Sequence, residues 1–435
     1  MSSATSTAST GRPASVGITV TLCFAVAVLE GFDIQAIGVA APRLAPELGL
    51  AEGQMGWIFA VSNIGIVIGA SLGGWLADRV GRKPVFMGAV SMFGVFTLAT
   101  ALAGDFAPLF AVRLLVGLGF GAALPNMMAV AAEISAPERR TITAAAMFCG
   151  LPLGGGTSAL LTQVLPPDLD WRVLFIIGGS LPLVIIPALY TWMAETLQPG
   201  SGNALRRAPV VQALFAEGRA APTLLLWLTF LPTLLILYLI LNWLPTLVAA
   251  KGLDRMVAPQ ASLAFNFGSI PGALLFGVLV DKLGPRWPLA TSYVALVAAL
   301  VLLGRAGGLG TIIFFSAAAG FFLMGANYSL YGVAAAYYPR AVRGTGSGAS
   351  VAVGRIGSVI GPLLVGMLLS RGLTATQVIL CMVPAAAVAG VSVFLLSFFR
   401  CAREPLALLP LPSGRLDPRT GFCCPQNAPN IGNVL

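Results

Sequence analysis

The sequence contains no histidine among its 435 residues. This absence excludes triads, metal sites and proton relays that need an imidazole group, so proton chemistry must use aspartate or glutamate. Charged residues make up only 9% of the chain, whereas soluble domains carry about 25%. The six cysteines form no Cys-x-x-Cys pair, so we expect no disulfide framework. We also expect no metal and no cofactor, and the sequence shows no nucleophile–base pair of an enzyme.

What the sequence has instead is apolar residues, at 57% of the chain. They form blocks of about 20 residues or more, the length that crosses the hydrocarbon core of a bilayer. The net charge of +9 does not indicate nucleic acid binding, because the basic residues are spread over the short connections between apolar blocks. The composition therefore predicts a polytopic membrane protein whose partner is the lipid bilayer.

The apolar blocks predict twelve transmembrane helices in two sets of six. Their approximate ranges are 16–42, 55–77, 84–103, 108–131, 142–165, 171–194, 222–248, 259–280, 288–305, 309–335, 344–370 and 374–400. The predicted fold is an all-α membrane protein with two six-helix bundles, 16–194 and 222–400. A polar linker (195–221), where Pro, Gly and Ser argue against a seventh helix of the first half, joins them. A short segment (1–15) precedes them and a disordered Pro-rich tail (401–435) follows.

The distribution of positive charge predicts the orientation of the chain. An even number of spans places both termini on one side of the membrane, and most of the 25 Lys and Arg residues fall on that side. Because positive charge is retained on the cytoplasmic side, we expect both termini, the linker and the tail to be cytoplasmic. The expected location is a bacterial-type inner membrane.

An internal repeat supports the span count. "GWLADRVGRK" begins at Gly74 and "GVLVDKLGPR" begins at Gly277, an offset of 203 residues. Gly65 and Gly268 lie nine residues upstream of each copy and share that offset. Two halves of like topology explain such a repeat and are typical of transporters.

The first copy of the repeat resembles the loop-2/3 signature of the major facilitator superfamily, and the resemblance covers about residues 16 to 400. The matching residues are Gly74, Asp78, Arg79, Gly81, Arg82 and Lys83, with Asp281 in the degenerate second copy. Further stretches, "EGFDIQAIGVAAP", "RLLVGLGFGAALPN" and "VAVGRIGSVIGPLL", resemble the aromatic acid:proton symporter family, and within it the 3-(3-hydroxyphenyl)propionate transporters. The resemblance implies proton-coupled uptake of a small aromatic carboxylate by alternating access. We expect a functional monomer.

Two carboxylates, Glu30 and Asp33, lie inside the first predicted span. A charge at mid-membrane costs about 2.5–3.5 kcal/mol on insertion scales, and the i, i+3 spacing places both on one helix face. Either they form a structural pair with an arginine from another span, or they handle protons. Their counterparts in the repeat, Thr233 and Ile236, carry no charge, so the carboxylates are not part of the shared scaffold. We expect Asp33 to be the main proton carrier and Glu30 to share or tune its load.

Arg113 and Arg355 are the basic residues inside spans. A guanidinium group binds a carboxylate bidentately, so either arginine is a candidate for the substrate carboxylate. The alternative is that each neutralises Glu30 or Asp33. The family resemblance also links Arg113 to proton coupling, so Arg355 is the favoured substrate contact.

Several polar side chains in other spans are candidates for lining a substrate cavity. They are Asn126, Tyr238, Asn242, Asn327 and Tyr331. Each is explained equally well by hydrogen bonds between helices.

The signature residues at the inner end of the second span are candidates for a gate. Asp78 is expected to lie against a helix N-terminus of the opposite half and so to hold the inner gate shut in the outward-open state. Arg79, Gly81, Arg82 and Lys83 lie around it in the sequence. Glu133 is expected to pair with one of the arginines, and Asp281 is the counterpart of Asp78. The alternative is that these charges only mark the topology.

Two other functions remain as alternatives. A drug or metabolite:proton antiporter of the same fold usually carries Gly-x-x-x-Gly-Pro-x-x-Gly-Gly in its fifth span, whereas this span reads "GLPLGGG" from Gly150. The second alternative is a non-transporting membrane sensor, against which the lack of a soluble signalling domain argues.

Overall fold

The computed structural model describes most of the chain between residues 16 and 399. The described ranges are 16–135, 140–164, 170–193, 195–196, 210–253, 257–339 and 342–399. The predicted segment 1–15, the tail 401–435 and residues 197–209 of the predicted linker lie outside them. Within these ranges all regular secondary structure is helical.

The helices follow the apolar blocks of the sequence. They are α1 (Val16–Glu47), α2 (Glu52–Val80), α3 (Arg82–Thr100), α4 (Phe106–Ile134), α5 (Arg140–Val164), α6 (Arg172–Trp192), α7 (Val210–Phe215), α8 (Ala220–Ala249), α9 (Val257–Leu283), α10 (Arg286–Arg305), α11 (Leu309–Ala336), α12 (Arg343–Ser370), α13 (Ala375–Leu380) and α14 (Met382–Leu396). Among the described residues, eleven helical segments are long and apolar enough to cross a membrane. The α5 helix, with 25 residues, is not among these eleven, which were found within the described residues alone.

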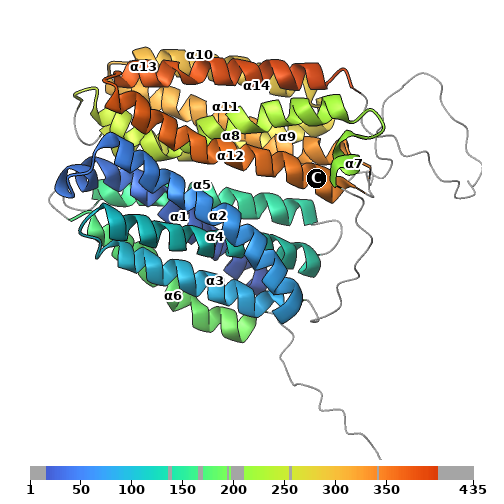
Figure 1. Ribbon diagram of the computed structural model, residues 1–435, viewed down its shortest axis with the longest axis horizontal. Helices are drawn as coiled ribbons and strands as arrows, with labels where there is room; N and C mark the ends of the chain where they lie inside the picture. Colours follow the sequence, from blue (N-terminus) through green and yellow to red (C-terminus); the bar gives the residue numbers. More distant parts are fainter. Residues whose placement is uncertain are drawn as a thin grey trace, which may run out of the picture.

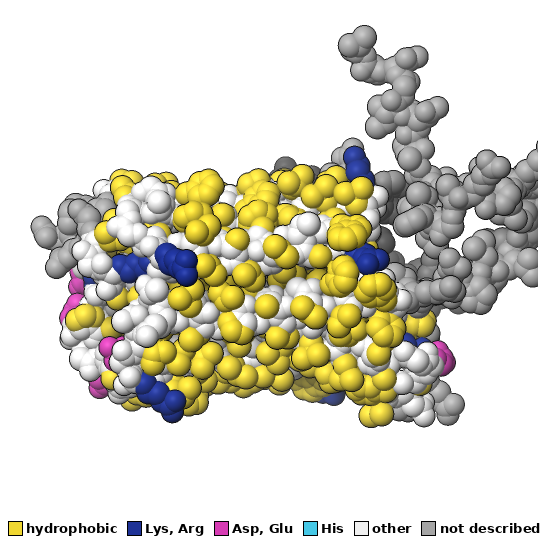
Figure 2. Space-filling view, turned by 90° about the horizontal axis from the view of Figure 1, so that it is seen from above, with side chains coloured by type: hydrophobic (Ala, Val, Ile, Leu, Met, Phe, Trp, Pro, Cys, Tyr) yellow, Lys and Arg dark blue, Asp and Glu magenta, His cyan; other side chains and the backbone are white. Residues whose placement is uncertain are grey.

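The helices form two groups that lie side by side (Figure 1). Helices α1 to α6 make one group and α8 to α14 the other, with α1, α2 and α5 of the first packed on α8, α12 and α9 of the second. Apolar side chains cover the middle of the visible surface and charged side chains lie mainly toward its two ends (Figure 2). The predicted fold class, two six-helix bundles in a membrane, is confirmed.

The structure adds two local details to the predicted spans. The stretch 195–221, where no seventh span of the first half is expected, contains α7, which has six residues and is too short to cross a membrane. The span predicted at 374–400 consists of α13 and α14, which meet at Cys381 and together form one span from Ala375 to Leu396. Both are details of local backbone geometry that an apolar run does not specify.

The repeat is visible in helix packing. A Cβ atom on Gly65 of α2 would lie 2.4 Å from the carbonyl oxygen of Leu114 in α4. At the same offset, a Cβ atom on Gly268 of α9 would lie 2.4 Å from the carbonyl oxygen of Ala317 in α11. Such glycines let the two backbones touch. The pairs α2–α4 and α9–α11 are therefore two copies of one packing unit.

Replacing Gly65 by alanine is expected to destabilise the protein by about 1–3 kcal/mol, because the added methyl group overlaps the α4 backbone. The matched control is Gly74→Ala in the same helix, where a Cβ atom meets nothing within 4 Å. Thermal unfolding in detergent measures both variants. An equal melting temperature for Gly65→Ala and wild type would contradict the close contact.

Candidate functional site

Asp33 and Arg113 form a buried ion pair between α1 and α4. The Nη1 atom of Arg113 lies 2.9 Å from Oδ2 and 3.2 Å from Oδ1 of Asp33, and the two side chains are 0% and 1% exposed. Thr97 of α3 donates a hydrogen bond of 2.8 Å to Oδ1 of Asp33, and Arg113 Nε donates to Ser62 Oγ of α2 at 3.3 Å. Four helices of the first group therefore hold one carboxylate in place.

Glu30 is buried one helical turn before Asp33, and its surroundings differ. Its Oε2 atom has no hydrogen-bond partner among the described residues. The charged groups that act on it are Arg355, of opposite sign, and Asp33, of like sign. No carboxylate oxygen in the described part of the chain lies within 4 Å of an Arg355 nitrogen. The two carboxylates therefore occupy different environments although they share one helix face.

Arg355 of α12 lines a cavity between the two groups of helices. The cavity has a volume of about 160 Å³, and we call it the central cavity. It is lined by Gly31, Ile34, Gln35, Leu124, Phe148, Leu151, Pro152, Leu234, Leu237, Tyr238, Leu241, Phe265, Asn266, Met324, Asn327, Tyr328, Tyr331, Val351 and Arg355. Arg355 Nη1 donates to the Tyr238 hydroxyl at 2.7 Å, and its guanidinium carbon lies 5.8 Å from the centre of the Tyr238 ring. One cation thus faces a largely apolar and aromatic chamber.

Aromatic rings from both groups of helices meet at this cavity. Phe148 of α5 lies 5.2 Å from the ring of Tyr328 and 5.9 Å from that of Tyr331, both on α11. The Tyr328 hydroxyl also donates to the backbone oxygen of Phe148 at 3.1 Å. Flat faces beside one guanidinium group suit a flat anion.

The polar residues singled out from the sequence divide between this cavity and other places. Tyr238, Asn327 and Tyr331 line the central cavity, and Asn327 Oδ1 has no partner among the described residues. Asn242 donates to the Tyr238 backbone oxygen at 2.7 Å and, with Arg113, lines a space of about 10 Å³ next to it. Asn126 donates to Ala122 O of its own helix at 2.8 Å and is absent from the described lining.

Further residues, not indicated by the sequence, complete the site. Gln35 donates to Leu241 O at 2.8 Å and accepts a hydrogen bond from Asn266 at 3.3 Å, so it joins α1 to α8 and α9. It lies within the same quoted stretch as Glu30 and Asp33, two residues beyond Asp33. Thr97 and Ser62 carry no sequence signal, because hydroxyl groups in apolar helices usually bond to their own backbone.

Tight backbone contacts close one end of the central cavity. We call this end the outer end, following the predicted orientation, and the contacts at Gly38 and Gly56 the outer seal. A Cβ atom on Gly38 of α1 would lie 2.8 Å from carbonyl oxygens of α8, and one on Gly56 of α2 would lie 3.1 Å from Pro362 O of α12. Trp243 of α8 reinforces the closure by donating to Pro362 O at 3.0 Å and packing edge-on against Phe59.

The signature residues at the other end contact their own half. Arg82 pairs with Glu133 at 2.7 Å, as expected for one of the arginines. Lys83 Nζ donates to Tyr190 O at 2.7 Å. The guanidinium group of Arg79 lies 4.0 Å from the Trp75 ring centre, and Gly81 joins α2 to α3 with a φ of 104°, which favours glycine.

A carboxylate of the first half lies at the N-terminus of α3. Glu195 Oε1 and Oε2 accept hydrogen bonds of 3.0 Å from the backbone N–H groups of Arg82 and Lys83, at the start of α3. Asp78 and Asp281 are exposed, and in the described ranges neither forms an ion pair. In this conformation the charged end of α2 is therefore not bound to the opposite half.

The chain is similar to known transporters over most of its length. The family model described as Major Facilitator Superfamily matches residues 23–266 and 252–422. The 3-(3-hydroxy-phenyl)propionate transporter of Escherichia coli (strain K12) is 39% identical over 94% of this chain and 100% of its own length. The gallate transporter of Pseudomonas putida is 33% identical over 81% of this chain and 85% of its own. The 4-hydroxybenzoate transporter PcaK of Pseudomonas putida is 31% identical over 86% and 91%.

A solved structure shares the fold. A bacterial homolog of the human lysosomal transporter Spinster, in an inward-facing and unoccupied conformation, superposes with a TM-score of 0.71 at 18% identity, covering 89% of this chain and 98% of that one. The family model, the relatives and the helix arrangement agree with the resemblance found in the sequence. The chain belongs to the major facilitator superfamily, a family of membrane transporters and not of enzymes.

Proposed function

We propose that this protein is a secondary active transporter that takes up small aromatic carboxylates together with protons by alternating access. The observation that carries the proposal is Arg355, a cation in an aromatic cavity between the two halves. The relatives support the substrate class, since three of them are named as transporters of hydroxylated aromatic acids. The two halves, 16–194 and 222–400, are proposed to move about the linker.

The cavity provides complementary groups for such a substrate. Arg355 donates one hydrogen bond to Tyr238, and its other N–H groups are proposed to bind the carboxylate. The rings of Phe148 and Tyr331 supply flat contacts for the aromatic ring. The unpartnered Oδ1 atom of Asn327 is proposed to accept a hydrogen bond from a ring hydroxyl.

Asp33 is proposed as the main proton carrier. Its carboxylate is held by Arg113 and Thr97, and a proton on Asp33 would remove the charge that binds Arg113. The charges of Asp33 and Arg355 both act on Glu30. The protonation of Asp33 and the binding of substrate at Arg355 are therefore proposed to affect each other through Glu30. Arg113 lies outside the central cavity lining and is assigned to coupling rather than to substrate.

The signature at the inner end of α2 is proposed to form the inner gate in the opposite conformation. Asp78 is exposed here and would contact the other half only when the inner end closes. Replacing Asp78 by alanine is therefore expected to lower the transport rate about tenfold and to leave substrate affinity within twofold. Initial uptake rates and equilibrium binding measure the two effects. A wild-type uptake rate in Asp78→Ala would contradict the proposed gate role of Asp78.

Uptake of labelled 3-(3-hydroxyphenyl)propionate into proteoliposomes, with and without an inward proton gradient, tests the proposed function. Benzoate and a non-aromatic acid serve as competitors. Gradient-dependent accumulation supports symport, and absence of uptake by folded, correctly oriented protein overturns it. Transport of one proton with one monoanion moves no net charge across the membrane. A second proton adds a driving force of about 2.3 kcal/mol per 100 mV of membrane potential. Dependence of uptake on the membrane potential therefore distinguishes one coupled proton from two.

Both termini are proposed to be cytoplasmic, because positive residues concentrate on that side. The working unit is proposed to be a monomer, since the central cavity is built from helices of one chain. Accessibility of cysteines introduced at positions 8 and 371 to an impermeant reagent tests the orientation.

A further inference from the structure

Gln35 of α1 makes two hydrogen bonds to the opposite half of the protein. Its Nε2 atom donates to Leu241 O of α8 at 2.8 Å, and its Oε1 atom accepts from Asn266 Nδ2 of α9 at 3.3 Å. Asn266 is itself held in place, because Nδ2 also donates to Ser262 O of its own helix at 2.8 Å. Gln35 and Asn266 are both 2% exposed. We call the two hydrogen bonds of Gln35 the Gln35 bridge.

The acceptor in α8 is a backbone carbonyl that its own helix cannot satisfy in the usual way. In an α-helix each carbonyl accepts from the N–H group four residues later. For Leu241 that residue is Pro245, inside α8, and proline has no N–H group. A buried carbonyl that is left without a partner costs free energy. The amide of Gln35 therefore supplies, from the opposite half, the donor that Pro245 lacks.

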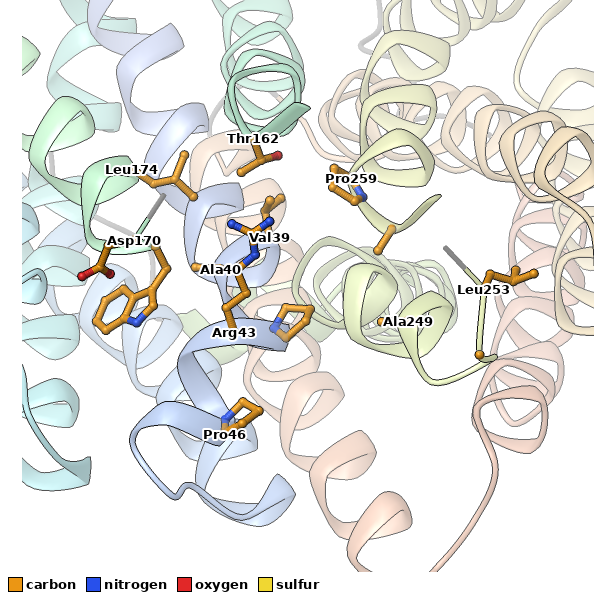
Figure 3. Close-up of a pocket in the computed structure, with 14 residues that line it drawn as sticks. Val39, Ala40, Arg43, Pro46, Thr162, Asp170, Leu174, Ala249, Leu253 and Pro259 are labelled. Atoms are coloured by element: carbon orange, nitrogen blue, oxygen red, sulfur yellow. The ribbon is translucent and has the colours of Figure 1, made fainter. Parts of the chain in front are cut away.

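The Gln35 bridge lies where the central cavity meets the outer seal. Gln35 and Leu241 line the central cavity, and Gly38 of the outer seal follows Gln35 by about one helical turn. A Cβ atom on Gly38 would lie 2.8 Å from Leu241 O, so the glycine lets α1 come close enough for Gln35 to reach this carbonyl. Beyond the seal, α1 and α8 border a second cavity, at Ala40 and Ala249 (Figure 3). A substrate in the central cavity therefore lies next to the Gln35 bridge, on the inner side of the seal.

Gln35 has a different residue as its counterpart in the internal repeat. The offset of 203 residues relates Pro42 to Pro245 and Gln35 to Tyr238. The proline is thus present in both halves, whereas the amide is present in one. The Tyr238 hydroxyl accepts its 2.7 Å hydrogen bond from Arg355 of its own half. Because the glutamine is not repeated, its amide is not part of the scaffold that the two halves share.

We propose that Gln35 is a positioning residue for the transport cycle, whose hydrogen bond to Leu241 O forms when the outer end closes and breaks when it opens. The inference rests on the proposed function, because it needs two halves that move by alternating access. When α1 moves away from α8, Leu241 O loses its donor and is hydrated by the water that enters the cavity. The Gln35 bridge therefore stabilises the outer-closed state and sets the fraction of molecules that are open to the outside.

Gln35→Met tests this role, because methionine has a similar length and donates no hydrogen bond. It leaves Leu241 O buried without its cross-half donor in the outer-closed state, so the outer-open fraction is expected to rise about fivefold. Distances between spin labels at Leu102→Cys and Leu309→Cys, two exposed outer positions in different halves, measure this fraction in protein whose native cysteines are replaced by serine. Gln163→Met is the matched control, since Gln163 bonds to its own helix. An unchanged distance distribution in folded Gln35→Met overturns the proposal.

Pro245→Ala provides a second and independent test. Alanine restores an N–H group that bonds to Leu241 O within α8, so the carbonyl no longer depends on Gln35. The outer-open fraction is expected to rise in Pro245→Ala, and adding Gln35→Met is expected to change it by less than about twofold more. In Pro232→Ala, which removes a second proline inside α8, Gln35→Met is expected to keep its effect of about fivefold.

Equal effects of Gln35→Met in the Pro245→Ala and Pro232→Ala backgrounds would overturn the link between Gln35 and the Leu241 carbonyl. Failure of wild-type uptake would instead overturn the proposed function. The spin-label distances require no uptake, so the two failures are distinguishable.

Discussion

Replacing Asp33 by asparagine is expected to abolish accumulation of substrate against its gradient. The asparagine amide does not gain or lose a proton near neutral pH. An inward proton gradient therefore no longer drives uptake. Labelled substrate accumulated in proteoliposomes measures the effect, and Glu52→Gln, which changes an exposed carboxylate at the start of α2, is the control. Wild-type accumulation by Asp33→Asn would contradict the assignment of the proton to this residue.

The same substitution leaves Arg113 buried without its counter-charge, and breaking a buried ion pair costs about 3–5 kcal/mol. Loss of activity must therefore be separated from loss of the fold. The double variant Asp33→Asn/Arg113→Gln removes both charges and is expected to regain much of the thermal stability while remaining unable to accumulate substrate. If the double variant accumulated substrate normally, the ion pair would be structural only.

Replacing Arg355 by glutamine is expected to weaken substrate binding by about 10- to 100-fold, since a hydrogen bond to a charged group contributes about 1.5–3 kcal/mol. Arg355→Lys keeps the charge but loses the planar fork, so its affinity is expected to lie between those of Arg355→Gln and wild type. Equilibrium binding of labelled substrate to purified protein measures all three.

Tyr238→Phe is the matched variant for Arg355. It keeps the ring beside the guanidinium group and removes only the hydroxyl that accepts the 2.7 Å hydrogen bond. A loss of affinity of about threefold is expected, because the arginine loses a positioning contact rather than its charge. Unchanged substrate affinity in Arg355→Gln would mean that another cationic residue binds the substrate carboxylate.

The sequence was sufficient for the membrane spans and the two-fold repeat. Apolar runs have a length set by the bilayer, and the observed helices begin and end within about five residues of the predicted bounds. The repeat was read from glycine spacing, and Gly65 and Gly268 make matching contacts with neighbouring helices. These features depend on composition and spacing along the chain, which a sequence displays directly.

The pairing of charges could not be predicted in the same way. The sequence showed two carboxylates and two arginines in spans, but not that Arg113 contacts Asp33 while Arg355 contacts Tyr238. Which side chains meet depends on the rotation and depth of each helix, and small shifts in either exchange the partners. For the same reason the bridge formed by Gln35 was seen only in three dimensions.

The outer seal has a consequence for energy conservation. At Gly38 and Gly56 the backbones of the two halves are in direct contact. At these two points the outer seal therefore contains no long side chain whose rotation would let a chain of water molecules pass. Because close-packed helices separate as units rather than by gradual deformation, the seal is either shut or fully parted. A cell that keeps this carrier in its membrane therefore loses little of its proton gradient through it between transport cycles.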